Sequence, residues 1–261
     1  MKRAALVFPL CLAAALAASN WTAPLVGVAR DAKNQLHPVY GVAGNFVLRG
    51  ALGGKVVNWA FDASGGLVET DGELWVLDAR ANVIERRPAP AGEVILSPRY
   101  AYFPKTGNLW PAGAGAGGAI GIEPAAIAGR VIAIGPADQQ GIVLAACRAN
   151  QLWLLTFNIS DGALLHESAP GGALGEQACA AGGGLLVLQD RLLVVSTHEI
   201  VIQTAAGRER RLAIRPNHGT TIHRAGEGAV QVQIPGSPSR MLHITADGER
   251  LFELPATEAR P

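Results

Sequence analysis

The chain has 261 residues, a formal net charge of +1 and 49% hydrophobic residues. This balance, with no basic stripe, argues against a nucleic-acid-binding surface. After the N-terminus, no apolar run approaches the ~18 residues of a spanning helix, so we expect no membrane insertion of the mature chain. Arginine outnumbers lysine 18 to 4, which is typical of a GC-rich bacterial genome.

Residues 1–18 have the pattern of a secretory signal peptide. Lys2 and Arg3 precede a short apolar run, and residues 15–17 (Ala-Leu-Ala) fit the small-x-small pattern of a cleavage site. An uncleaved anchor is the alternative, although about 13 apolar residues fall short of the ~20 that a spanning helix needs. We therefore predict a periplasmic or extracellular protein whose mature chain is one domain over residues 19–261.

Short β-like runs separated by Gly, Asp and Asn fill the rest of the chain, and few stretches show helical spacing. The pattern predicts six hairpins, over residues 25–40, 74–88, 109–122, 152–166, 192–214 and 241–254. Further strands are predicted before these hairpins, at residues 56–61, 67–70, 94–96, 100–103, 131–134, 142–146, 178–181, 185–188, 220–223 and 229–234. The first hairpin has no such predecessors, and residues 45–49 are a candidate partner for it.

The turns of the six hairpins recur in steps of about 43 residues, which is the blade length of a four-stranded β-propeller. A β-sandwich or jelly roll is the alternative, but a fixed period disfavours both. We predict an all-β fold, a β-propeller with six repeats and five or six blades. We also expect strands from the two ends of the chain to close the ring by pairing or by lying in adjacent strands, because exposed edges would otherwise remain.

A Trp or Leu in a strand, a polar turn and a second strand every ~40 residues resemble the WD40, NHL and YVTN-type propellers over residues 25–255. The Trp-Asp dipeptide of WD40 blades is absent, since Val76 follows Trp75 and Leu154 follows Trp153. Residues 25–48 are also similar to uncharacterised exported proteins of acidobacterial type. That resemblance implies export and brings no activity.

Two classes of function are open for such a propeller. The first is a non-catalytic, monomeric binding module without a cofactor, which holds a protein or glycan at its rim loops or channel mouth. We favour it because propellers mostly serve as rigid platforms for loops. In addition, neither the Ser-x-Asp-x-Gly-x-Thr-Trp box of sialidases nor the Trp docking motif of quinone-dependent dehydrogenases is present.

The second class is a lactonase or hydrolase acting in the central channel. Lactonase-like propellers use Glu, Asn and Asp around a central Ca²⁺, and Glu69, Asn58, Asn150 and Asp62 are residues of these types. No motif places them together. Carboxylates that converge on the axis with raised pKa values would favour the enzyme. An axis lined by Ala, Gly and aliphatic groups would favour the binding module.

His218, His223 and Glu227 have the chemistry of a Zn²⁺ site. The two histidines are five residues apart, however, so they face opposite sides of a strand. We interpret them as an exposed loop histidine and a strand histidine, and we predict no metal. The other histidines, at positions 37, 166, 198 and 243, are expected to be half-exposed in outer strands and turns.

Cys147 and Cys179 are the two cysteines of the mature chain. In an oxidising compartment an even pair predicts a disulfide, and two buried free thiols are the alternative. We expect both on inner strands of consecutive repeats.

The one basic cluster consists of Arg208, Arg210, Arg211 and Arg215. An anion-binding edge is one interpretation. We favour a solvated hairpin turn, because Glu209 interrupts the cluster and outer strands are usually charged.

Overall fold

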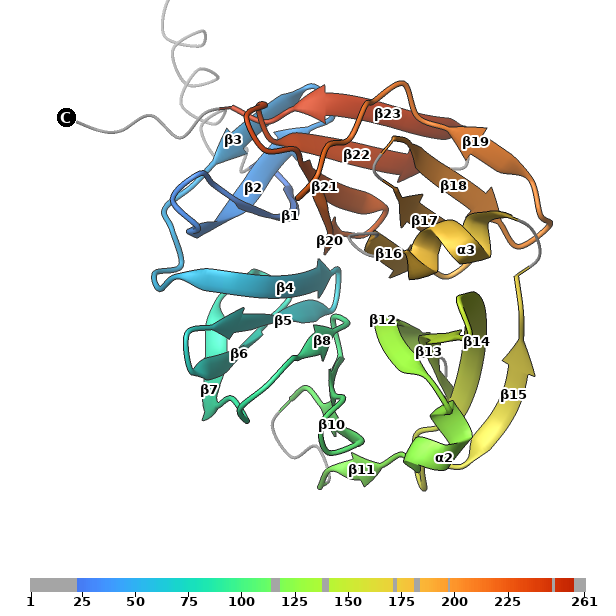
Figure 1. Ribbon diagram of the computed structural model, residues 1–261. Coiled ribbons are helices and arrows are strands. Elements are labelled where there is room, and N and C mark those ends of the chain that lie inside the picture. Colours follow the sequence, from blue (N-terminus) through green and yellow to red (C-terminus); the bar gives the residue numbers. More distant parts are fainter. Residues whose placement is uncertain are drawn as a thin grey trace, which may run out of the picture.

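The computed structural model describes residues 23–113, 118–137, 141–170, 173–180, 184–196, 198–245 and 247–255. The predicted signal peptide lies outside these residues. Six antiparallel sheets stand in a ring, and each is a simple succession of neighbouring strands (Figure 1). The chain is therefore an all-β, six-bladed β-propeller, as predicted. Within the described ranges no helix is long and apolar enough to cross a membrane.

The N-terminal sheet has three described strands: β1 (Leu25–Arg30), β2 (Leu36–Val42) and β3 (Asn45–Leu48). The second sheet has four: β4 (Val56–Asp62), β5 (Gly65–Thr70), β6 (Glu73–Leu77) and β7 (Val83–Pro88). The third consists of β8 (Ile95–Leu96), β9 (Tyr100–Phe103), β10 (Asn108–Pro111) and β11 (Ile120–Gly121).

The fourth sheet follows the short helix α2 (Pro124–Ile127) and consists of β12 (Arg130–Ala137), β13 (Gly141–Arg148), β14 (Gln151–Asn158) and β15 (Leu164–Ser168). Helix α3 (Ala173–Cys179) leads into the fifth, β16 (Gly184–Val187), β17 (Arg191–Val195), β18 (Ile200–Thr204) and β19 (Glu209–Arg211). The sixth is β20 (Thr221–Gly226), β21 (Ala229–Gln233), β22 (Arg240–Thr245) and β23 (Gly248–Glu253).

Several hairpins turn on the same local device, an Asp or Asn whose side-chain oxygen accepts the backbone N–H two residues later. Asp31, Asp62, Asp78 and Asn158 each accept such a bond at 2.8 Å. Asp78 also accepts the N–H of Asn82, which closes the turn between β6 and β7 that the sequence predicts. These turns depend only on neighbouring residues, so they are readable from the sequence.

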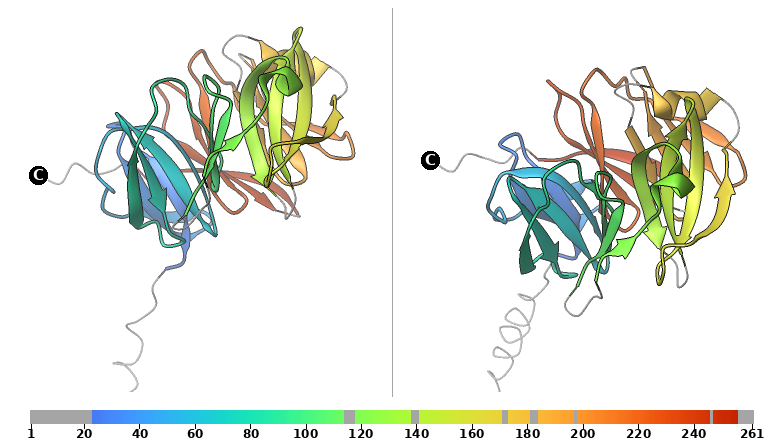
Figure 2. Two further views of the ribbon diagram at one scale, coloured as in Figure 1. Left: turned by 90° about the horizontal axis from the view of Figure 1, so that it is seen from below. Right: turned by 60° about the horizontal axis from the view of Figure 1, so that its bottom comes forward.

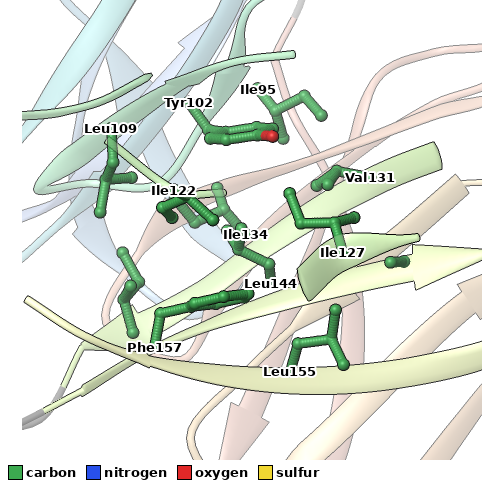
Figure 3. Close-up of a cluster of buried hydrophobic side chains, with 12 residues drawn as sticks. Ile95, Tyr102, Leu109, Ile122, Ile127, Val131, Ile134, Leu144, Leu155 and Phe157 are labelled. Carbon is green, nitrogen blue, oxygen red and sulfur yellow. The ribbon is translucent and has the colours of Figure 1, made fainter. Parts of the chain in front are cut away.

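The hydrophobic core lies between neighbouring sheets. Figure 3 shows one such layer, in which Tyr102 and Leu109 of the third sheet pack with Leu144 and Phe157 of the fourth. Ile127 of α2 belongs to the same layer. Because each sheet buries apolar side chains on both faces, its strands read as nearly continuous apolar runs.

The first and last sheets meet where the ring closes, with the red C-terminal strands beside the blue N-terminal ones (Figures 1 and 2). The backbone N–H of Arg30 in β1 donates to Oε1 of Gln231 in β21, and Nε2 of Gln231 donates to the Arg30 carbonyl, both at 2.8 Å. Phe46 and Phe252 add an edge-to-face contact with ring centroids 5.8 Å apart. Strands from the two ends therefore close the ring, as predicted.

Of the two expected arrangements, the ends lie in neighbouring strands and do not pair within one sheet. β1–β3 and β20–β23 form separate ladders, because the N-terminal segment supplies enough strands for a sheet of its own. The first predicted hairpin is accordingly the inner pair, β1 and β2, and β3 covers the predicted partner at residues 45–49.

Inner strands of five sheets form a continuous circle of contacts, β4 to β8, β12, β16, β20 and back to β4. The N-terminal strand β1 touches both β4 and β20. It approaches β20 so closely that a Cβ atom added at Gly27 or Gly226 would overlap a carbonyl oxygen of the other strand. The N-terminal sheet thus packs beside the contact between β4 and β20.

The sequence-based prediction is wrong in the fifth sheet. Residues 178–181 were expected to form its first strand, but Ala178 and Cys179 end helix α3, and β16 is the inner strand. Leu174 and Ala178 are four residues apart and both buried, which is helical spacing. The strand predicted as the second of this sheet, at residues 185–188, is therefore its first, and β18 was not predicted as a separate strand.

Candidate functional site

A cavity with a volume of about 840 Å³ opens where the inner strands end. Its lining includes Asp62 at the end of β4, Arg99 in the turn after β8 and Arg224 near the end of β20. These three charged residues come from different sheets. Since the inner strands all run in one direction along the axis, the residues that end them gather at one face of the ring.

One wall of the cavity is aliphatic. It is formed by Val143 and Leu154 of the fourth sheet and by Val187 and Leu192 of the fifth. Gly141, at the start of β13, lies in the same lining. The rest of the lining is largely polar and includes Thr156, Ser168, Gln189, Gln203 and Thr204, so one aliphatic wall faces polar ones. The volume is within the range of small-molecule sites.

Asp62, Ser64 and the two arginines form a connected group at the rim. Oδ1 of Asp62 accepts from the backbone N–H of Ser64 at 2.8 Å and from its hydroxyl at 2.5 Å. Nε of Arg99 donates to the Ser64 hydroxyl oxygen at 3.1 Å. Nη2 of Arg224 is 3.6 Å from Oδ2 of Asp62, which is an ion-pair distance too long for a hydrogen bond.

Arg191, which also lines the mouth, is bound more completely. Its Nε and Nη2 donate to the two carboxylate oxygens of Asp190 at 2.9 and 2.7 Å, and Glu249 lies 3.5 Å away. The hydrogen bonds from Arg191 lower the pKa of Asp190. Asp190 is therefore a carboxylate whose ionised form is favoured, which suits ion pairing and not proton transfer near neutral pH.

A second cavity of about 560 Å³ adjoins the first at this mouth. It shares Asp62, Arg99, Arg191 and Arg224 with the larger one and adds Glu227. The mouth is thus a wide, mixed-charge opening in front of an aliphatic wall.

The four residues proposed for a lactonase-like centre are not brought together. Asn58 and Glu69 are cross-strand neighbours in the second sheet, and Asn58 donates to the Val94 carbonyl at 3.2 Å. Asn150 lies in the exposed turn between β13 and β14. Asp62 alone lines the cavities. The set therefore has no common centre on which a Ca²⁺ ion could be held.

Burial raises the pKa of Glu69 to about 7, and the negative charge of Glu93 adds to this shift. A carboxyl group that titrates near neutral pH can serve as a general acid or base. Glu69, however, is not among the residues that line the described cavities. Glu69 lies beside Asn58 in the second sheet and therefore outside the reach of a ligand bound at the aliphatic wall.

The three residues considered as a zinc site are also apart. His218 is exposed in the loop before β20, Glu227 is exposed at the cavity mouth, and the His223 ring stacks on Trp59 with centroids 3.6 Å apart. Within the described ranges, no three His, Cys, Asp or Glu residues gather as they would around a metal ion.

His37 corrects the expectation that the remaining histidines are half-exposed. It is buried in β2, where Nδ1 is 2.7 Å from the Arg49 carbonyl oxygen and Nε2 is 3.1 Å from Asp31 Oδ2. His166 and His198 are exposed, and His243 is half-buried. Two polar partners satisfy the His37 ring, so burial is possible there.

The basic cluster is solvated, as favoured from the sequence, but it is not a turn: Arg210 and Arg211 lie on the outer strand β19, and Arg208 and Arg215 lie in the segments that flank it. Arg210 pairs with Glu249, and Arg211 lies 3.3 Å from Glu199. Arg208 and Arg215 are exposed. None of these four arginines lines a described cavity.

Cys147 and Cys179 are joined in the structure, with Cα atoms 5.6 Å apart. Their placement differs from the expected inner strands, since Cys147 is in β13 and Cys179 ends helix α3. The bond fastens the helix to the fourth sheet, next to Leu152 and Leu174 in the layer that the helix shares with the fourth and fifth sheets.

Replacing both cysteines by serine should lower the free energy of unfolding by about 2–4 kcal/mol, because the unfolded chain gains conformational freedom when the crosslink is absent. Urea denaturation of the oxidised protein and of the double variant would measure this difference. The control is dithiothreitol, which should destabilise the wild type and leave the double variant unchanged. Equal denaturation midpoints for the oxidised protein and the variant would contradict the prediction.

No family model and no curated protein matches this chain. Among solved structures, it is similar to a functionally unknown protein from Desulfotomaculum acetoxidans, with 11% identity, a TM-score of 0.46 and coverage of 90% of this chain and 86% of that one. It is also similar to a putative TolB from Agrobacterium tumefaciens, with 12% identity, a TM-score of 0.45 and coverage of 80% and 83%. The WD40 domain of Toxoplasma gondii coronin gives 9% identity, a TM-score of 0.43 and coverage of 89% and 70%.

At the cavity mouth, the charged residues that were not selected from the sequence as site residues are Arg99, Asp190, Arg191 and Arg224. Arg99, Asp190 and Arg191 follow, within a few residues, an apolar run that forms an inner strand, whereas Arg224 lies inside the inner strand β20. A charge at the same end of successive inner strands is the signal that could have identified them.

Proposed function

We propose that the protein is an exported, monomeric, non-catalytic binding module that takes its ligand at the channel mouth. The observation that carries the proposal is the 840 Å³ cavity, with its aliphatic wall and its rim of paired charges. An aliphatic wall that faces polar and charged groups suits recognition, because it buries part of a ligand and orients the rest. A segment of a protein or a glycan remains the class of partner, and the predicted signal peptide supports export.

The enzyme alternative receives less support from the same residues. Catalysis by a carboxyl group requires a pKa near the working pH and a position within reach of the substrate. Glu69 has such a pKa but lies outside the cavity lining, whereas Asp190 is in the lining and its pKa is lowered. The two requirements are met by different residues.

The neutral fluorescent probe N-phenyl-1-naphthylamine tests whether the cavity takes an apolar ligand. We expect saturable binding to the purified protein. Val143→Trp, which places a large ring in the wall, should weaken binding by about tenfold or more, since the lost pocket volume removes apolar contact. Ile84→Trp is the matched control, because Ile84 is 58% exposed on β7 and outside the cavity lining.

Equal probe affinity in the two tryptophan variants, or no saturable binding at all, would refute the proposed site. Hydrolysis of p-nitrophenyl acetate and of a γ-lactone should stay at the buffer rate for all three proteins. Turnover by the wild type that is lost in Val143→Trp would instead support the enzyme.

A further inference from the structure

Arg224 is a partly buried cation with few partners. Its side chain is 19% exposed, and its nearest carboxylate is that of Asp62, 3.6 Å away. In the described part of the chain its guanidinium makes no hydrogen bond, although it carries five N–H donors. Burial lowers the pKa of Arg224, while Asp62 and Glu227 act against that shift. Arg224 lines both cavities, so its donors are available to a ligand there.

Asp62 does not satisfy Arg224, because Oδ1 accepts two bonds from Ser64 and Oδ2 lies 3.6 Å from Nη2 of Arg224, too far for a hydrogen bond. Ser64 also accepts the bond from Nε of Arg99, which leaves the two terminal amino groups of Arg99 uncommitted among the described residues. Two guanidinium groups therefore flank a single carboxylate. Arg191 differs, since Asp190 and Glu249 both hold it.

The surroundings restrict which anion could bind between these arginines. Asp62, Asp190 and Glu227 stand at the same mouth, and their charges would repel a doubly charged phosphate more strongly than a single carboxylate. Val143, Leu154 and Val187 form the aliphatic wall that would cover an apolar body. A guanidinium binds a carboxylate in a bidentate manner, which also fixes its orientation.

We propose that Arg224 and Arg99 form a carboxylate-binding site whose ligand is a monocarboxylate with an apolar body, seated against the aliphatic wall of the cavity. The ligand is either the free C-terminus of an apolar peptide, which belongs to the protein partners proposed above, or a small aliphatic acid, which presents the same chemistry and would extend that class. This inference rests on the proposed function, since it assigns the ligand class of the same cavity.

Displacement of N-phenyl-1-naphthylamine tests the inference with matched pairs of competitors. Octanoate is compared with octanamide, and the peptide acetyl-Ala-Leu-Val with its C-terminal amide. At least one acid should displace the probe at a concentration about tenfold below that of its amide, as expected for one or two charge-assisted hydrogen bonds. Either acid supports the proposal, and the pair with the larger preference identifies the source of the carboxylate.

Arg224→Gln should abolish the preference for the acid, and Arg99→Gln should reduce it. Arg99 is exposed, so this second variant keeps the test valid if the first does not fold. The control is Arg80→Gln, because Arg80 is exposed in the turn between β6 and β7 and outside the cavity lining; it should keep the wild-type preference. A higher salt concentration should also weaken the preference for the acid.

Equal displacement by acid and amide in both pairs would overturn the carboxylate site. So would an acid preference that persists in both arginine variants. Either result would leave the proposed function standing, provided that the neutral probe binds and Val143→Trp weakens it. Absence of probe binding would refute the proposed function itself, and direct calorimetric titration with octanoate would then decide the carboxylate site separately.

Discussion

Replacing Trp59 by alanine should lower the free energy of unfolding by about 3–5 kcal/mol, the range for large aromatic side chains removed from a core. Trp59 is 2% exposed in β4, at the point where the ring closes. The His223 ring of β20 stacks on it at 3.6 Å, and the Arg30 guanidinium of β1 lies 4.9 Å from its ring centroid. This side chain of the second sheet therefore contacts the first and the sixth sheets.

Urea denaturation of the wild type and of Trp59→Ala would measure this loss, with the slope reporting whether unfolding stays cooperative. Trp153→Ala is the matched control. Trp153 is half-buried in β14, where it lies under Arg148 of the same sheet and far from the closure. We expect a smaller loss for it. Equal losses in the two variants would show that the closure makes no special contribution to stability.

Acid should destabilise the fold through His223. Its pKa is lowered to about 3, mainly by burial and then by the charge of Arg30, while a hydrogen bond with the Trp59 backbone acts in the opposite direction. In the described part of the chain Nε2 of His223 has no hydrogen-bond partner, so a proton there would have no acceptor. The folded protein therefore holds this ring in its neutral form.

Whether acid raises or lowers the free energy of unfolding depends on whether the folded or the unfolded state binds the proton. Above the unfolded pKa of about 6.5, His223 is neutral in both states and contributes no pH dependence. Below that pH the unfolded chain takes up a proton that the folded protein refuses, so the free energy of unfolding falls. The slope is about 1.4 kcal/mol per pH unit for one proton, down to the folded pKa near 3.

Urea denaturation between pH 7 and pH 3 would measure this slope in the wild type and in His223→Phe, which keeps an aromatic ring against Trp59. In His223→Phe the slope of the free energy of unfolding against pH should be smaller by about 1.4 kcal/mol per pH unit, the value for one proton. His218→Gln is the control, because His218 is exposed in the loop before the same strand. An unchanged slope in His223→Phe would rule out His223 as the source of acid sensitivity.

Much of the fold could be predicted from short stretches of sequence. Strand alternation, and side-chain oxygens such as those of Asp31 and Asp78 that close turns, act over a few residues. Hairpins that such local signals determine recur about every 43 residues, so the number of repeats can be counted without tertiary information. The prediction was wrong in the fifth sheet because residues 173–179 are short and rich in Ala and Gly, which makes their helical spacing a weak signal.

The cavity mouth was less accessible to sequence reasoning. Asp62, Arg99 and Arg224 are each separated from the next by tens of residues, and each alone resembles an ordinary charge at a strand end. Glu69 and Asn58 were chosen as candidates by residue type, yet they face the contact between the second and third sheets. Residue type cannot distinguish these positions, because the direction of a side chain depends on strand register.

The sequence alone determined the class of the fold, its repeat and most of its strands, because these arise from contacts between neighbours in the chain. The tertiary structure decided how the ring closes, through Arg30, Gln231 and the stack of Trp59 on His223. It also decided which charges meet at the cavity mouth and which secondary structures hold Cys147 and Cys179. These features depend on the curvature of the ring and the packing between sheets, which bring together residues up to about 200 positions apart, so local pattern carries no record of them.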